Sequence, residues 1–290
     1  MERHLLQELS GFLNKEQILS SDLYREIYAR DGSYFDIKPE VIVRPGTTEE
    51  VRKILAVAVK YHTGVTFRTG GTSLSGQSVN KGIICELRTG WKKKEIRENG
   101  KKIWFEPGLT VGQVNRFLYP YHTKIGPDPA SSVAAMMGGV LSNNSSGMQT
   151  GTAYNSYHTL SDMEFMLING HRYHSSDPAD RKRFEETERT LCQGLMKIRS
   201  EILSHDKIRN RIIEKYKIKN VTGYGMNTFI DFDEPIDIFT HLLIGAEGTL
   251  GFIVSAELNT LPVFPVYSSS MLYFQDVVHA AAAASPLGES

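Results

Sequence analysis

The sequence predicts an α+β fold, and three observations carry this prediction. An amphipathic helix pattern at 47–62 lies between apolar runs at 41–45 and 65–68, which predicts a strand–helix–strand unit. Asn169-Gly170, between two apolar segments, is a strong signal for a two-residue β-hairpin turn. Further strands are expected at 82–87 and 102–108. Strands, helices and turns are therefore mixed within one domain.

The helix at 47–62 has signals at both ends. Thr47 and Glu50 have the spacing of a capping box, and Gly64 is expected to close the helix. The helical spacing predicts a buried face made of Val51, Ile54, Leu55, Ala58 and Val59.

Three later segments complete the prediction of elements. Thr110 and Gln113 form a second capping box, which starts a helix over 110–121. The charged stretch 178–216 carries an apolar stripe and is predicted as amphipathic helix packed on the outside of the sheet. The stripe consists of Leu191, Leu195, Ile198 and Ile202. A strand at 271–274 and a helix containing 280–285 are expected at the end.

Composition excludes several classes of protein. The 290 residues carry 33 basic and 33 acidic side chains, so no global field recruits nucleic acid or an anionic membrane. No apolar run reaches the roughly 18 residues that would span a bilayer, and we expect a cytoplasmic protein, with peripheral attachment to the inner membrane left open. Cys85 and Cys192 are expected to be ordinary buried thiols, and no HExxH or CxxC motif predicts a metal site.

The stretch "RTGGTSLSGQS" at 68–78 is close to a phosphate-binding pattern, but Gln77 stands where the pattern needs lysine. The glycines of this loop permit left-handed conformations and a close approach of backbone N–H groups to an anion. Without the lysine a nucleoside triphosphate is disfavoured, and a diphosphate fits better. The alternative is a surface turn without a ligand.

Two more segments are rich in small residues. "IGPDPASSVAAMMGGVLSNNSSG" covers 125–147, and "IGAEGTLGFIVSAELNTLP" covers 244–262. Small side chains would let a flat ligand lie against the main chain. Three such segments in one chain predict a long ligand that crosses several loops.

These segments resemble the FAD-linked oxidases of the vanillyl-alcohol oxidase and p-cresol methylhydroxylase (PCMH) type, over about 37–264. The matching motifs are "RTGGTSLSG", "PDPASSVAAMMGGVLSNNSSG" and "GAEGTLG". The stretch "IKNVTGYGMNTFIDF" and the helical insertion before it are most similar to the bacterial D-lactate and D-2-hydroxyglutarate dehydrogenase branch, which includes glycolate oxidase subunits. The usual third glycine of the first loop is Thr69 here.

The resemblance implies a set of residues that bind FAD. Its pyrophosphate would lie on Gly70, Gly71, Thr72 and Ser73. The ribityl chain and isoalloxazine would lie along Pro127, Asp128, Ser132, Gly138, Gly139 and Asn143, with Glu247, Gly248 and Ile253 completing the cradle. Neighbouring motif residues are also expected to bind the cofactor, namely Arg68, Gly76, Gln77, Ser146 and Gly147.

Several of these positions have another interpretation. Asp128 could be a turn or N-cap residue that binds local backbone, and Glu247 could cap a strand end or pair with an arginine. Members of the family that bind flavin covalently do so through a histidine at the position of Thr72, so the resemblance implies noncovalent FAD. His122, His158 and His241 are expected to fill turns or packed surfaces.

The resemblance also implies a domain organisation. A helical arm at 1–36 would precede a two-subdomain PCMH-type FAD-binding domain at 37–264, with its helical insertion at about 178–216. Residues 265–290 would begin a truncated ferredoxin-like substrate (cap) domain, in which the catalytic and metal-binding groups of the family lie. We therefore expect no flavin reduction by this chain alone.

The implied activity is oxidation of a D-2-hydroxy acid (D-lactate, D-2-hydroxyglutarate or glycolate) to the 2-oxo acid, with hydride transfer to flavin N5. Electrons would then pass to a quinone, a cytochrome or an iron–sulfur partner. Two alternatives remain: an alcohol oxidase or cell-wall sugar reductase of the same fold, and a flavin-binding module without catalysis of its own.

Overall fold

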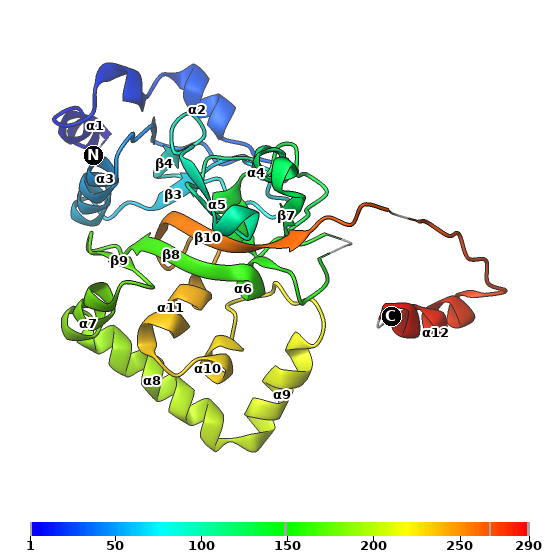
Figure 1. The fold of residues 1–290 in the computed structure, drawn as a ribbon. Coiled ribbons are helices and arrows are strands. Elements are labelled where there is room, and N and C mark those ends of the chain that lie inside the picture. Colours follow the sequence, from blue (N-terminus) through cyan, green and yellow to red (C-terminus); the bar gives the residue numbers. More distant parts are fainter. Residues whose placement is uncertain (1, 148–149, 267, 289–290) are drawn as a thin grey trace.

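The computed structural model describes residues 2–147, 150–266 and 268–288, arranged around two sheets (Figure 1). The smaller sheet has the order β1(Ile18–Leu19), β2(Val41–Val43), β4(Ile83–Glu86), β3(Val65–Arg68). Strands β2 and β3 both run parallel to β4, and β1 is antiparallel to β2. The predicted strand–helix–strand unit is present, but β4 lies between its two strands.

Helix α3(Thr48–Lys60) connects β2 to β3, and its ends differ from the prediction in detail. The Thr47 hydroxyl accepts the Glu50 N–H, but the Glu50 carboxylate accepts the N–H of Gly46, so only half of the capping box forms. The chain leaves the helix through His62, whose φ is 50°, and the prediction that Gly64 closes it was wrong.

The buried face of α3 is correct except for Val59. Val59 is 53% exposed, and Val57 is buried instead. The reason is that α1(Glu2–Leu9) packs on the side of α3 that carries Val57, where Leu5 and Leu9 join Val57 in one apolar cluster. Within the described residues 2–36, α1, β1 and α2(Asp22–Tyr28) pack against the smaller sheet and α3, and together these elements form the smaller subdomain.

The larger sheet is antiparallel, with the order β5(Lys94–Arg97), β6(Lys102–Phe105), β10(Phe252–Pro262), β8(Leu160–Met166), β9(Arg172–His174). Strand β7(Thr123–Ile125) also pairs with β10. Strands β8 and β9 form the predicted hairpin. Its turn spans three residues, 168–170, because the Leu167 N–H bonds the His171 carbonyl. Within this turn only Gly170 has a positive φ (83°).

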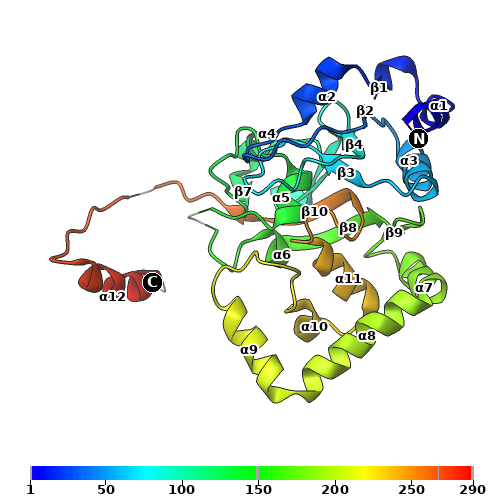
Figure 2. The same cartoon turned by 180° about the vertical axis from the view of Figure 1, so that it is seen from behind.

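Helices cover one face of the larger sheet (Figures 1 and 2). The insertion consists of α7(Pro178–Thr187), α8(Arg189–Ser204) and α9(Asp206–Tyr216), followed by α10(Thr228–Asp231) and α11(Pro235–Leu243). Phe184 of α7 and Phe239 of α11 contact Phe165 of β8, with ring centroids 6.0 and 5.2 Å apart. The insertion therefore packs outside the sheet as predicted.

The remaining helices lie nearer the junction of the two sheets. They are α4(Val111–Leu118), α5(Met137–Asn143) and α6(Ser156–Thr159), and short 3₁₀ turns occur at Lys15–Gln17, Glu98–Gly100 and Tyr119–Tyr121. The capping box of Thr110 and Gln113 forms with both reciprocal hydrogen bonds. Helices α4 and α5 bury Val114, Leu118 and Leu141 in the main core.

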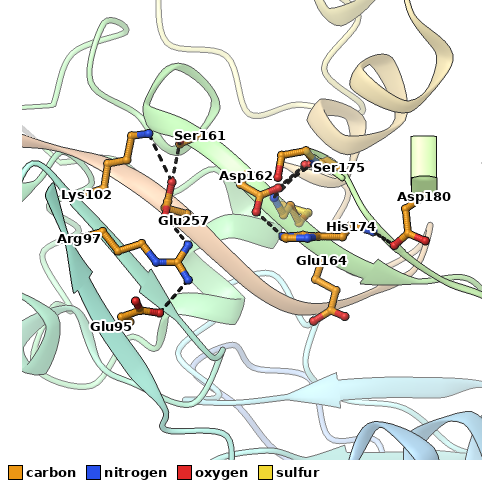
Figure 3. A network of polar contacts seen from close by, with 12 residues as sticks. Glu95, Arg97, Lys102, Ser161, Asp162, Glu164, His174, Ser175, Asp180 and Glu257 are labelled. Carbon is orange, nitrogen blue, oxygen red and sulfur yellow. Dashed lines mark hydrogen bonds and ion pairs between the residues drawn. The ribbon is translucent and has the colours of Figure 1, made fainter. Parts of the chain in front are cut away.

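A polar network crosses the larger sheet on β10 (Figure 3). The buried carboxylate of Glu257 accepts hydrogen bonds from Arg97 at 2.8 Å and Ser161 at 3.0 Å. On β8, Asp162 accepts the Ser175 hydroxyl at 2.8 Å and contacts His174. Both carboxylates have polar partners, so the network leaves neither of them as an unpaired buried charge.

The final segment departs from the prediction. Residues 271–274 form no strand, whereas α12(Val277–Gly288) forms as expected at the end of an extended stretch that points away from both sheets (Figure 1). A strand needs a hydrogen-bonded neighbour, and no described segment runs beside these residues. Among the described residues, no helix has both the length and the apolar character to cross a membrane.

Candidate cofactor-binding site

A cavity of about 400 Å³ lies where the two subdomains meet. Its wall is formed by the loop after β3, by the start and body of α5, and by the segment that leads into β10. The structure thus brings together the three small-residue segments that the sequence singled out. Of the predicted residues, those that line it are Gly70, Gly71, Thr72, Ser73, Gln77, Gly138, Gly139, Asn143, Ser146, Glu247, Gly248 and Ile253.

The loop after β3 is shaped by its glycines. Gly71 and Gly76 have φ of 64° and 82°, a conformation that costs side-chain-bearing residues free energy. A Cβ on Gly70 would lie 2.6 Å from the Ala134 carbonyl oxygen, so this position also requires glycine. The loop and the segment before α5 therefore approach each other through main chain.

Five consecutive N–H groups of this loop, from Gly70 to Leu74, donate to no described atom. The Ser73 hydroxyl stabilises the loop itself, because it accepts the N–H groups of Ser75 and Gln77 and contacts the Gln77 side chain. Unpaired N–H groups in a turn form a concave anion site. This arrangement fits a diphosphate.

Two predicted loop residues lie behind the loop. Arg68 donates to main-chain carbonyls of the smaller subdomain and is not part of the cavity wall. Gly76 packs against Phe35, whose ring a Cβ would approach to 2.5 Å, and it too lies outside the wall. The structure gives neither residue a direct contact with the cavity.

The second small-residue segment, 125–147, also contains some predicted residues that line the cavity and others that lie outside its wall. Gly138 and Gly139 lie on α5 beside Pro107 and Thr69, where a Cβ on Gly138 would reach Pro107 at 2.7 Å. Asp128 accepts the Gly147 N–H at 2.8 Å and the Thr150 hydroxyl, so its partners lie 19 and 22 residues further along the chain and not in a local turn. Pro127, Asp128, Ser132 and Gly147 therefore shape the segment from outside the wall.

Glu247 connects the third segment to α5. Its carboxylate accepts the Asn143 side-chain amide at 2.6 Å, and its N–H donates to the Ser142 carbonyl at 2.8 Å. Burial raises the pKa of Glu247 above its usual value, although the hydrogen bond from Asn143 opposes this. Its φ of 53° is left-handed, which strains a residue with a side chain. Among the described residues Glu247 forms no ion pair with an arginine, and the partner of its carboxylate is Asn143.

Part of the wall consists of residues that the sequence did not predict for the site. Lys219 and Val221, from the segment after α9, line the cavity, and the Lys219 ammonium donates to the Ser146 carbonyl at 3.2 Å. Pro107 and Phe252 also line it. Lys219 and Glu247 are the two ionisable side chains in the described wall. Lys219 joins the wall because the segment after α9 lies beside Ser146, which is 73 residues earlier in the sequence.

The three histidines discussed for the sequence do not line the cavity. His122 has a φ of 53° and ends a 3₁₀ turn, and His158 bonds Asn155 at the start of α6. His241 stacks on Phe232 with centroids 3.9 Å apart, and burial lowers its pKa. Cys85 and Cys192 are buried as expected. Within the described residues, no cluster of three or more His, Cys, Asp or Glu could hold a metal ion.

Comparison with known proteins agrees with this geometry. Residues 39–176 match the family described as FAD binding domain. This stretch is similar to FAD binding domains. It contains β2 to β9, and thus the glycine-rich loop and α5, while Glu247 and β10 complete the cavity from beyond the matched residues.

Curated relatives extend the similarity along the chain. D-2-hydroxyglutarate dehydrogenase of Haemophilus influenzae is 29% identical over 82% of this chain and 24% of its own length. The protein of the same name from Pantoea ananatis is 31% identical over 80% of this chain and 23% of its own. Glycolate oxidase subunit GlcD of Escherichia coli is 27% identical over 53% of this chain and 32% of its own. The chain thus spans about a quarter to a third of these relatives.

Solved structures share the fold of the FAD binding domain at low identity. The structure of p-cresol methylhydroxylase with substrate bound matches with a TM-score of 0.62 at 15% identity, over 91% of this chain and 44% of that chain. The expected PCMH-type fold is therefore confirmed.

Proposed function

We propose that this chain is the flavin-binding portion of an FAD-dependent dehydrogenase that oxidises a D-2-hydroxy acid to the 2-oxo acid. The observation that carries the proposal is the row of five N–H groups, from Gly70 to Leu74, that have no partner among the described residues and belong to a loop lining the cavity. The curated relatives named D-2-hydroxyglutarate dehydrogenase and glycolate oxidase subunit support the substrate class.

The residues of the wall fit FAD. The N–H groups of Gly70 to Leu74 would bind the diphosphate, and α5 with its glycines would lie against the flat ring system, next to Val140 and Phe252. FAD, when bound, supplies a hydride acceptor. The chain's own residues would hold the cofactor in place and exclude water from its apolar side. Thr72 has no imidazole that could form a covalent bond with the flavin, so we propose that FAD binds noncovalently.

The test has two steps. Apoprotein is first titrated with FAD, and we expect saturation at one FAD per chain with a shift of the flavin absorbance bands. The complex is then mixed anaerobically with D-2-hydroxyglutarate, D-lactate or glycolate. We expect no bleaching from this chain alone, because hydride transfer needs a base at the substrate hydroxyl and the carboxylate of Glu247 is held by Asn143.

Each result decides a different point. Failure to bind FAD would refute the proposed site. Rapid bleaching with any of the three acids would show that the catalytic groups are already in this chain. The alternative of an alcohol oxidase or sugar reductase predicts that the full-length protein is reduced by a substrate other than a 2-hydroxy acid.

A further inference from the structure

The guanidinium of Arg68 lies directly beneath the turn of the glycine-rich loop. A Cβ placed on Gly71 would lie 2.8 Å from Nη2 and 2.9 Å from Nε of Arg68. Gly71 lines the cavity and Arg68 does not. The main chain of Gly71 therefore lies between this positive charge and the cavity.

Arg68 is fixed in this place by neutral groups. Its Nη1 donates to the carbonyls of Tyr28 at 3.1 Å and Ser78 at 3.4 Å, and its Nη2 donates to the carbonyl of Arg30 at 2.7 Å. The guanidinium also lies over the Tyr28 ring, 5.2 Å from its centroid. These contacts set the orientation of Arg68, and none of them is with a negatively charged group.

Within the described residues, Arg68 forms no direct ion pair. The nearby carboxylate of Asp31 is bound by Ser33 and by the Ser78 hydroxyl at 2.8 Å. Burial lowers the pKa of Arg68, and the charge of Asp31 offsets only part of this effect. The neighbouring Arg44 is different, because its Nε contacts the Glu86 carboxylate at 2.7 Å.

We propose that Arg68 is a positioning residue that supplies a fixed counter-charge to the diphosphate of FAD, acting through the main chain of Gly71. This inference rests on the proposed function and adds the source of the positive charge. The loop lacks the lysine of nucleotide-binding loops, with Gln77 in its place, and a guanidinium beneath the turn compensates for it. A charge held there attracts the diphosphate without entering the cavity.

The experiment measures the FAD dissociation constant at several salt concentrations for the 290-residue chain and its variants. For Arg68→Met we expect an increase of about tenfold or more and a weaker salt dependence, because attraction between a cation and an anion is screened by salt. Arg68→Lys keeps the charge, so its salt dependence should stay close to that of the unchanged protein although its affinity falls. Arg44→Met is the matched control: it should lower the melting temperature and leave the salt dependence unchanged.

A purely structural role for Arg68 would weaken binding without changing its salt dependence, and this result for Arg68→Met would overturn the inference. The same conclusion follows if Arg44→Met flattens the salt dependence equally. Should Arg68→Met fail to fold, Arg68→Gln replaces it, since glutamine can still donate to the Arg30 carbonyl. If the unchanged chain binds no FAD at all, the proposed function fails first, which is a distinct outcome.

Discussion

Replacing Gly71 by alanine tests whether the loop must keep its shape to bind FAD. Gly71 has a φ of 64°, and the added Cβ would lie 2.8 Å from Arg68 Nη2. The left-handed conformation costs alanine about 1 kcal/mol, and the close contact adds about 1–3 kcal/mol if the guanidinium cannot move. Because three carbonyls hold the guanidinium, we expect the loop to shift instead.

A shifted loop misaligns the N–H groups that face the cavity. Losing one hydrogen bond to a charged ligand costs about 1.5–3 kcal/mol, so the dissociation constant of FAD should rise at least about tenfold. The assay is titration of apoprotein with FAD, followed by flavin fluorescence, together with the melting temperature without FAD.

A second glycine provides the control for backbone strain alone. Gly151 also has a positive φ, 54°, and no described atom lies within 4 Å of its added Cβ. Gly151→Ala should therefore lower the melting temperature slightly and leave FAD affinity unchanged. An unchanged FAD affinity in Gly71→Ala would refute the assignment of this loop to the diphosphate.

Two further predictions concern the bond to the cofactor and the charge at Glu247. Because Thr72 replaces the tethering histidine, acid precipitation should release yellow flavin into the supernatant, and colour in the pellet would contradict noncovalent binding. Burial raises the pKa of Glu247, so its contribution to folding stability is present at acidic pH and is lost as pH rises through the raised value. Glu247→Gln, which can still accept the Asn143 amide, should melt above the unchanged apoprotein at neutral pH. This advantage should vanish in acid, and one that grows on acidification would contradict the argument.

The sequence by itself determined the local features of this protein. Helix α3, the capping box at Thr110 and the hairpin at Gly170 depend on residues within a few positions of each other, and all three formed. The three small-residue segments were also identifiable, because glycine permits conformations and close contacts that other residues do not. The local errors were at the end of α3, where His62 took the left-handed position expected for Gly64, in the half-formed capping box at Thr47, and in the hairpin turn, which has three residues instead of two.

Only the tertiary structure decided which motif residues face the cavity. Arg68 and Asp128 belong to the same motifs as Gly71 and Asn143, yet the first two are turned toward neighbouring backbone and the others line the wall. Lys219 reaches the wall from a segment that no motif marked as part of the site. The strand expected at 271–274 did not form, because strand formation depends on a partner. Spacing along the chain fixes backbone conformation, whereas the direction of a side chain depends on contacts between residues far apart in sequence.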